Sequence, residues 1–170
     1  MKLVIENDLA KIHELETQNQ LIEKTDYIYP NKLTDGELFY LVEINGFNFG
    51  LLANDYGTPI KISEIKQDKY LIIESDTFYL IDSDKQDIFH YTSDEIIIDV
   101  ILLENETIII NDISVACYEN DDFSLLWRLE LALLVTEYEH DDFLLTLTLA
   151  DSDEKVIIDL LSGNILTEFN

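Results

Sequence analysis

Residues 70–91 read YLIIESDTFYLIDSDKQDIFHY, and residues 107–128 read TIIINDISVACYENDDFSLLWR. At a constant offset of 37, each stretch contains three short apolar runs, and polar turns fall on polar turns. Short apolar runs that end at Asn, Asp, Ser or Gly are typical of β-strands joined by tight turns. The two stretches therefore predict a repeated antiparallel meander.

The rest of the chain has the same pattern. Residues 39–44 and 47–52 flank Asn45-Gly46, a pair that accepts the positive φ angles of a type I′ hairpin turn. Residues 11–24 match residues 156–169 at an offset of 145, with five identities in fourteen, which predicts a strand, a turn and a strand at both places. Together the repeats predict five units, which begin near Lys2, Leu38, Lys69, Glu106 and Phe143.

The last unit contains IIDLLSGNIL at residues 157–166. This resembles the closing half of a quinoprotein-type (PQQ-like) β-propeller repeat, a relative of the WD40 repeat, and residues 124–128 are similar to its returning strand with the usual Trp. Phe169 stands where the last unit would carry that Trp, and the Gly-His and Trp-Asp pairs of WD40 repeats are absent. The resemblance implies a fold and a scaffold that presents surfaces, because fold alone does not fix function.

The predicted fold class is thus all-β, an antiparallel meander of about five short repeats in a small β-propeller-like arrangement. An open curved sheet or a β-sandwich is the alternative. We expect a single β-repeat domain over residues 1–170. In a closed ring, the N-terminal strand at residues 2–6 would complete the last unit and remove two exposed edges.

Charge limits the class of partner. The chain has 36 Asp and Glu against 10 Lys and Arg, a formal net charge of −26, although 47% of its residues are apolar. Binding to nucleic acid or to an anionic membrane is not expected, because both depend on Lys and Arg. The lone Cys117 and the lack of a secretory signal in residues 1–10 fit a cytoplasmic location.

The sequence contains no convincing motif for catalysis or for binding a cofactor. The sequence has no Gly-rich phosphate loop, no Cys pair and no nucleophile elbow, so we expect no enzyme activity, no cofactor and no metal. The runs 82–87 and 151–154 look like calcium loops but lack the Gly and Glu that an EF-hand requires. A calcium-assisted enzyme is the weakest hypothesis, and turn chemistry explains the same residues.

The predicted turns are rich in Asp and Glu. Because turns of like position meet at one end of a regular meander, these side chains are expected to form one negative face that attracts a cationic partner. The expected partner-binding residues are Asp82, Asp84, Asp121, Asp122, Glu139, Asp141, Asp142, Asp151 and Asp153.

Two functions of different class remain open. The first is a noncatalytic acidic inhibitor that blocks a basic toxin or nuclease by charge complementarity, in general character similar to bacterial immunity proteins. The second is a propeller-like scaffold or recognition module that binds proteins or glycans. Net charge adapted to a saline environment is a third explanation of the acidity, and the sequence leaves the oligomeric state open.

Overall fold

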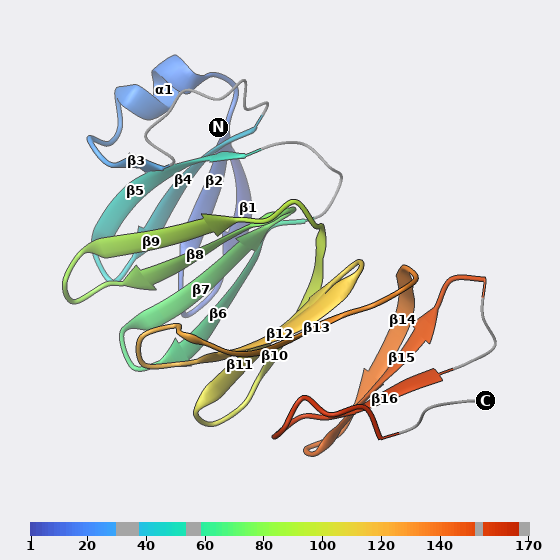
Figure 1. The fold of residues 1–170 in the computed structure, drawn as a ribbon. Coiled ribbons are helices and arrows are strands. Elements are labelled where there is room, and N and C mark those ends of the chain that lie inside the picture. Colours follow the sequence, from blue (N-terminus) through green and yellow to red (C-terminus); the bar gives the residue numbers. More distant parts are fainter. Residues whose placement is uncertain (30–37, 54–58, 152–154, 167–170) are drawn as a thin grey trace. The chain divides into compact units, whose positions relative to one another are not determined.

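The protein divides into two compact units in the computed structural model, Met1–Asp94 (unit 1) and Glu95–Asn170 (unit 2). Residues 1–29, 38–53, 59–151 and 155–166 are described, and nearly all of their regular structure is β-strand (Figure 1). No helix among these residues is long and apolar enough to span a membrane. The expectation of one domain over the whole chain stays a prediction.

Unit 1 contains two sheets (Figure 1). The first has the order β1-β2-β4-β5-β3 and is antiparallel except for the short parallel pair β3 and β5. The second is a four-stranded meander, β6-β7-β8-β9. The strands are β1 (Lys2–Glu6), β2 (Lys11–Leu15), β3 (Ile28–Tyr29), β4 (Leu38–Ile44), β5 (Phe47–Ala53), β6 (Lys61–Lys66), β7 (Lys69–Glu74), β8 (Thr77–Asp82) and β9 (Asp87–Thr92).

Unit 2 also contains two sheets. One is the four-stranded meander β10-β11-β12-β13, and the other is the three-stranded meander β14-β15-β16. The strands are β10 (Ile97–Leu102), β11 (Glu106–Asn111), β12 (Ser114–Glu119), β13 (Leu125–Glu130), β14 (Val135–His140), β15 (Leu144–Leu149) and β16 (Lys155–Asp159). After β16 the chain turns back, and Ile165 forms a single antiparallel bridge with Ile158.

The repeat at offset 37 is confirmed. Strands β7 and β8 occupy the positions that β11 and β12 occupy 37 residues later, at both ends of each strand. The predicted all-β, propeller-like meander of antiparallel sheets is therefore confirmed, and each four-stranded sheet has the up-and-down order of a propeller blade.

The division into repeats differs from the expectation in two ways. The expected units that begin near Lys2 and Leu38 belong to one sheet, so the described residues form four sheets and not five units. The other expected units begin at β7, β11 and β15, which are the second strands of their sheets. The first strand of each of these three sheets pairs irregularly with the second, since each of the pairs β6 with β7, β10 with β11 and β14 with β15 contains a register shift.

Two expectations about the N-terminal region are wrong. Strand β1 pairs with β2 in the first sheet of unit 1 and does not complete the last sheet. Residues 18–22 form helix α1 (Gln18–Ile22) where the repeat at offset 145 predicts a strand. Thr17 caps this helix by accepting a hydrogen bond from the Gln20 N–H, and Gln20 Oε1 in turn accepts one from the Glu16 N–H.

The turn chemistry that the sequence predicts is present at two glycines. Asn45 and Gly46 have φ angles of 48° and 81°, as a type I′ turn between β4 and β5 requires. Gly163 has a φ of 69°, in a turn closed by hydrogen bonds from the Gly163 N–H to the Asp159 carbonyl and from the Asp159 N–H to the Asn164 carbonyl. A Cβ on Gly163 would lie 2.5 Å from Cδ2 of Trp127, so the chain passes directly over the indole ring.

Each unit has its own apolar core between its two sheets. In unit 1, side chains of β2, β4 and β5 pack with those of β7 and β8. In unit 2, side chains of β11 and β12 pack with those of β15 and β16. Cys117 and Trp127 belong to the core of unit 2, as their apolar surroundings in the sequence suggest. In β15 only Leu145, Leu147 and Leu149 are buried, so the other face of the last sheet is polar.

Candidate partner-binding surface

The strand directions of unit 2 define two edges. In an antiparallel meander, the turns after the first and third strands share one end, and the turn after the second strand lies at the other end. Backbone hydrogen bonds join turns at the first end: the Asn120 N–H donates to the Asn105 carbonyl, and the Leu160 N–H donates to the Phe143 carbonyl. We call this end, formed by residues 102–106, 119–125, 139–144 and 159–166, the acidic edge.

The opposite edge is tied together in the same way. The Val135 N–H donates to the Asp112 carbonyl, and the Ala150 N–H donates to the Leu134 carbonyl. Strands β10 and β14 therefore both begin at the opposite edge and both run toward the acidic edge. Tyr138 and Asp99, one on each of these strands, form a hydrogen bond that fits this alignment.

The acidic edge contains no Lys or Arg in the segments that define it. Its carboxylates lie in the turns or at the strand ends beside them. They are Glu104, Glu106, Glu119, Asp121, Asp122, Glu139, Asp141, Asp142 and Asp159. Their mutual repulsion is not offset by any Lys or Arg side chain of this edge, so the surface is strongly negative.

Unit 2 as a whole has 18 Asp and Glu against two cations, Arg128 and Lys155, whereas unit 1 has 18 against eight. Both cations lie nearer the opposite edge. Lys155 is the first residue of β16, and Arg128 donates a hydrogen bond to Glu95, which lies just before β10. Arg128 donates to Glu95 and Glu130, each at 2.5 Å. Glu95, whose side chain is 9% exposed, also accepts a hydrogen bond from Ser114 Oγ.

Several of the acidic side chains also shape the turns. Asp141 accepts hydrogen bonds from the backbone N–H groups of Phe143 and Leu144, which lower the pKa of its carboxyl. Asp159 accepts bonds from the hydroxyl and backbone N–H of Ser162, and these also lower its pKa. These residues therefore have a structural role in the turns and keep their charge at neutral pH.

The structure brings together only part of the predicted set. Asp121, Asp122, Glu139, Asp141 and Asp142 lie on the acidic edge of unit 2. Of the remaining four predicted site residues, two belong to unit 1, one belongs to the opposite edge of unit 2, and one is outside the described residues.

Asp82 and Asp84 lie in unit 1, in the turn between β8 and β9, where Asp82 is bonded to Lys85 at 2.7 Å. Asp151 follows β15, the second strand of its sheet, and so lies at the opposite edge. Asp153 is outside the described residues. The expectation of a single negative face was too broad, because the turn after the second strand points away from the turns after the first and third.

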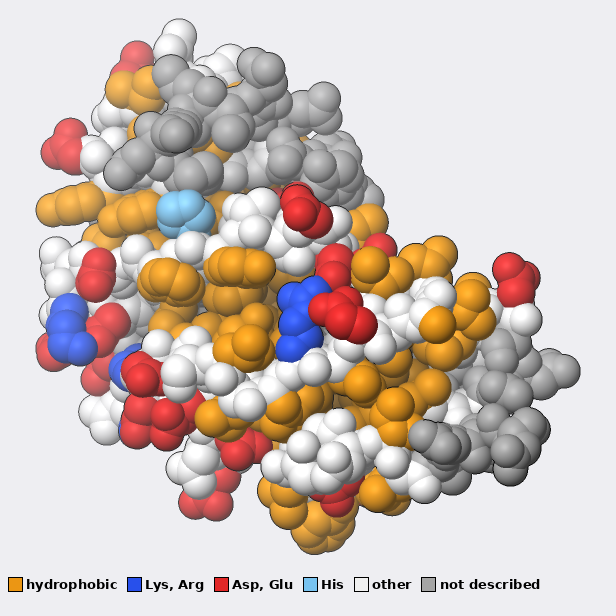
Figure 2. Space-filling model, in the orientation of Figure 1, with side chains coloured by type: hydrophobic (Ala, Val, Ile, Leu, Met, Phe, Trp, Pro, Cys, Tyr) orange, Lys and Arg blue, Asp and Glu red, His pale blue; other side chains and the backbone are white. Residues whose placement is uncertain are grey.

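Sequence analysis missed two features of the acidic edge. Phe143 and Leu161 are 64% and 66% exposed, in neighbouring turns that the bond from Leu160 to Phe143 holds together. Beside them is a hollow of about 200 Å³, lined by Glu139, His140, Asp141, Leu144 and Thr146. In the face drawn in Figure 2, hydrophobic side chains reach the surface over the strands of unit 2 with Asp and Glu beside them. An apolar residue directly after Asp141-Asp142 in a turn was the available sequence signal.

A larger hollow of about 380 Å³ lies over β14, β15 and β16. Ile98 and Tyr138 are its bulkier lining residues, and the others are polar: Thr136, Glu137, Glu139, Thr146, Thr148 and Lys155. It offers hydroxyl, carboxylate and ammonium groups around one aromatic ring. This is a composition that suits a small polar ligand.

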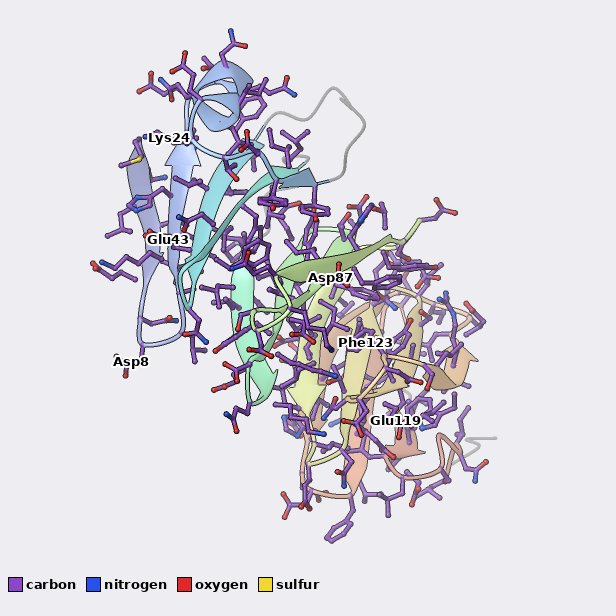
Figure 3. The ribbon with its side chains drawn as sticks, turned by 90° about the vertical axis from the view of Figure 1, so that its left-hand side faces the viewer. Asp8, Lys24, Glu43, Asp87, Glu119 and Phe123 are labelled. Atoms are coloured by element: carbon purple, nitrogen blue, oxygen red, sulfur yellow. The ribbon has the colours of Figure 1, made fainter. Side chains whose placement is uncertain are left out.

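Unit 1 has a mixed charge distribution at its turns. Asp8 lies at the tip of the turn between β1 and β2, at the end of the sheet opposite Lys24 (Figure 3). Near Asp8, Lys11 forms an ion pair with Glu6 at 3.2 Å. Because cations accompany the acids here, unit 1 is a weaker candidate than unit 2 for binding a basic partner.

The described residues contain no group of three or more His, Cys, Asp or Glu side chains that could hold a metal ion. His90 packs against Tyr79, its cross-strand partner, at 6.1 Å between ring centroids, which agrees with a packing role. Burial, and then the neighbouring Glu106, raise the pKa of the Cys117 thiol to about 12, so it is not a nucleophile at neutral pH.

Comparison with known proteins finds only weak structural likenesses. No protein-family model matches the sequence, and no curated protein matches it significantly. Among solved structures, Hsv2 of Kluyveromyces lactis is similar with a TM-score of 0.40 and 11% identity, over 63% of this chain and 35% of that one. Hsv2 of Kluyveromyces marxianus has a TM-score of 0.48 and 10% identity, over 75% and 44% of the two chains.

The present chain therefore spans less than half the length of these neighbours. Likenesses at this level of identity and TM-score carry no argument about activity or partners.

Proposed function

We propose that the protein is a noncatalytic acidic inhibitor, with the general character of an immunity protein, that binds a basic toxin or nuclease and blocks its working surface. The proposal includes a cytoplasmic location and no cofactor. The observation that carries it is the acidic edge of unit 2, whose segments contain nine carboxylates and no Lys or Arg. A surface that binds nucleic acid must be basic, so a nuclease offers the complementary charge.

Charge placement of this kind acts mainly on the rate of association. Complementary potentials raise association rates by about 10- to 1000-fold, and the gain falls steeply with ionic strength. Asp141 and Asp159 are charged at neutral pH, as solvent-accessible Asp side chains are, and the hydrogen bonds of their turns lower their pKa values further. The acidic edge is therefore suited to rapid capture of a cationic surface.

The test is stopped-flow association with basic nucleases, measured from low to high salt, together with inhibition of their cleavage of a fluorogenic oligonucleotide. The test variant replaces the exposed residues Glu104, Asp121, Glu139 and Asp142 by Lys and keeps Asp122 and Asp141, whose carboxylates accept turn hydrogen bonds. We expect capture to slow about tenfold at low salt, because the four changes take the formal charge of the acidic edge from −9 to −1 and so remove most of its attraction for a cationic surface.

A matched control separates local from total charge. Replacement of Asp8, Glu16, Glu23 and Asp26 by Lys changes the net charge equally, at exposed positions in unit 1. The control variant should retain most of the association rate. Equal slowing by both variants, or capture that does not depend on salt, would refute binding through the acidic edge.

The hollow over the last sheet favours a second candidate function, a recognition module for small polar ligands such as glycans. Thr146, Thr148 and Lys155 supply donors on neighbouring strands, and Tyr138 lies beside them. Calorimetric titration with a panel of oligosaccharides tests it. Binding that is lost in Thr148→Val and is insensitive to salt would favour this module over the inhibitor.

A further inference from the structure

We infer that the acidic edge contains a two-part docking surface, in which Phe143 and Leu161 cover an apolar patch of the partner while the adjoining hollow receives one of its Arg or Lys side chains. This inference rests on the proposed function and names the partner chemistry: a basic protein segment in which a cation and a large apolar side chain are neighbours.

The apolar part of the docking surface consists of two highly exposed side chains. Phe143 and Leu161 are the most exposed large hydrophobic residues in the described part of the chain. Burying a Phe or Leu side chain is worth about 1.5–3 kcal/mol relative to leaving it in water. Both side chains therefore offer apolar surface that a partner could cover.

Their proximity is fixed by the backbone. The hydrogen bond from the Leu160 N–H to the Phe143 carbonyl, 2.8 Å long, joins the two turns. The Phe143 N–H is itself held by the Asp141 carboxylate at 2.8 Å. The patch is thus pre-formed, so little conformational entropy is lost when a partner covers it.

The hollow beside the patch has the chemistry to receive a cation. Glu139 and Asp141 line it with Thr146, the cross-strand partner of Glu139. Hydrogen bonds from the Phe143 and Leu144 N–H groups fix the Asp141 carboxylate in the turn. No Lys or Arg lines the hollow, so a guanidinium or ammonium group would meet the carboxylates of Glu139 and Asp141.

Charge complementarity selects this occupant over others. An acidic partner or a second copy of unit 2 would bring more carboxylates against the nine of this edge. A purely apolar partner would leave those carboxylates facing a surface that cannot pair with them. A basic segment with an apolar residue satisfies both parts of the surface.

The two parts should act on different rate constants. Rim charges set the association rate and its salt dependence, whereas a buried apolar anchor sets the dissociation rate. Two synthetic peptides of equal length and charge serve as probes, one of alternating Lys and Leu and one of alternating Lys and Ser. Both are measured against the full chain by surface plasmon resonance at several salt concentrations.

For the Lys/Leu peptide, the double variant Phe143→Ser, Leu161→Ser should dissociate about tenfold faster with an unchanged association rate, because the anchor is lost. The Lys/Ser peptide should be indifferent to this variant. The matched control is Leu133→Ser, Leu134→Ser, which removes two exposed apolar side chains from the opposite edge and should change neither peptide. Asp141→Asn keeps an acceptor for the turn and should weaken both peptides several-fold.

Dissociation of the Lys/Leu peptide that is equal in the Phe143, Leu161 variant and the unsubstituted protein would overturn the inference, and so would equal effects of the control. Neither result would contradict the proposed function, which is tested separately by the salt dependence of binding to basic nucleases. Loss of that capture with an intact Lys/Leu effect would instead remove the inhibitor and leave the docking surface. Circular dichroism confirms that each variant is folded.

Discussion

Replacement of Gly163 by Ala should destabilise unit 2 much more than the same replacement of Gly46 destabilises unit 1. Both glycines have positive φ angles, 69° and 81°, so both variants place Ala in left-handed backbone. Only Gly163 is also crowded: its added Cβ would lie 2.5 Å from Trp127 Cδ2 and 2.8 Å from two more ring atoms. Around Gly46 no atom lies within 4 Å of the added carbon.

The magnitudes follow from these two contributions. Left-handed backbone costs an L-residue about 1–2 kcal/mol. Overpacking a filled site costs about 1–3 kcal/mol, because the ring or the turn must move. Gly163→Ala should therefore cost about 2–5 kcal/mol in the free energy of unfolding. Gly46→Ala should cost only about 1–2 kcal/mol.

The assay is urea unfolding followed by far-ultraviolet circular dichroism for both variants. Trp127 is the only Trp, so its fluorescence reports unit 2 specifically, and its emission should shift in native Gly163→Ala as the indole is displaced. A loss of stability in Gly163→Ala that does not exceed the loss in Gly46→Ala would refute the close approach of the turn to the ring.

Three other predictions concern buried or titrating groups. The thiol of Cys117 should react with a thiol reagent at least about 100-fold more slowly in the native protein than in urea, since burial raises its pKa to about 12; fast native labelling would contradict this. Arg128→Met should cost about 1–3 kcal/mol in urea unfolding, because the buried Glu95 loses a counter-charge, and adding Glu95→Gln should restore part of it. A lone Arg128→Met variant as stable as the original would contradict that pairing. The Asp159 carboxyl has a lowered pKa, so its bonds to Ser162 stabilise the turn at neutral pH and are lost as pH falls through that lowered value. The Ser162 amide resonance should titrate with a midpoint below about 3.9, the ordinary value for Asp, and a midpoint above it would be inconsistent with the turn.

Strand positions were predictable wherever the apolar runs were continuous. Strands β7, β8, β11 and β12 are buried along most of their length, so their sequences read as runs of Ile, Leu and aromatic residues. The Asn45-Gly46 turn was predictable because few residue pairs accept two positive φ angles. The sequence of β15, LLTLTL, alternates because one of its faces is polar.

Helix α1 could not be separated from a strand by the comparison within the chain. Its sequence, QNQLI, matches a strand in apolar positions, and only the Thr17 cap with Gln20 favours a helix. A helix of five residues contributes too little periodicity to outweigh an apparent repeat. Leu21 then packs against Gly50, a contact between distant segments that no local pattern predicts.

The candidate site was predictable in composition but not in placement. Acidic turns are visible in the sequence, yet their distribution between two edges depends on the number of strands that precede each turn. Asp151 was misplaced for this reason. The exposure of Phe143 and Leu161 could not be predicted from the sequence either, because Phe and Leu are more often buried than exposed.

The charge of unit 2 is distributed unevenly along its strands, with Arg128 and Lys155 toward one end and the nine carboxylates of the acidic edge at the other. Such a body has a permanent dipole moment along the strand direction. In the field of a cationic macromolecule it experiences a torque that turns the negative pole toward that macromolecule before any atoms touch. Rotational searching, which normally slows protein encounters, would then be partly completed during the approach.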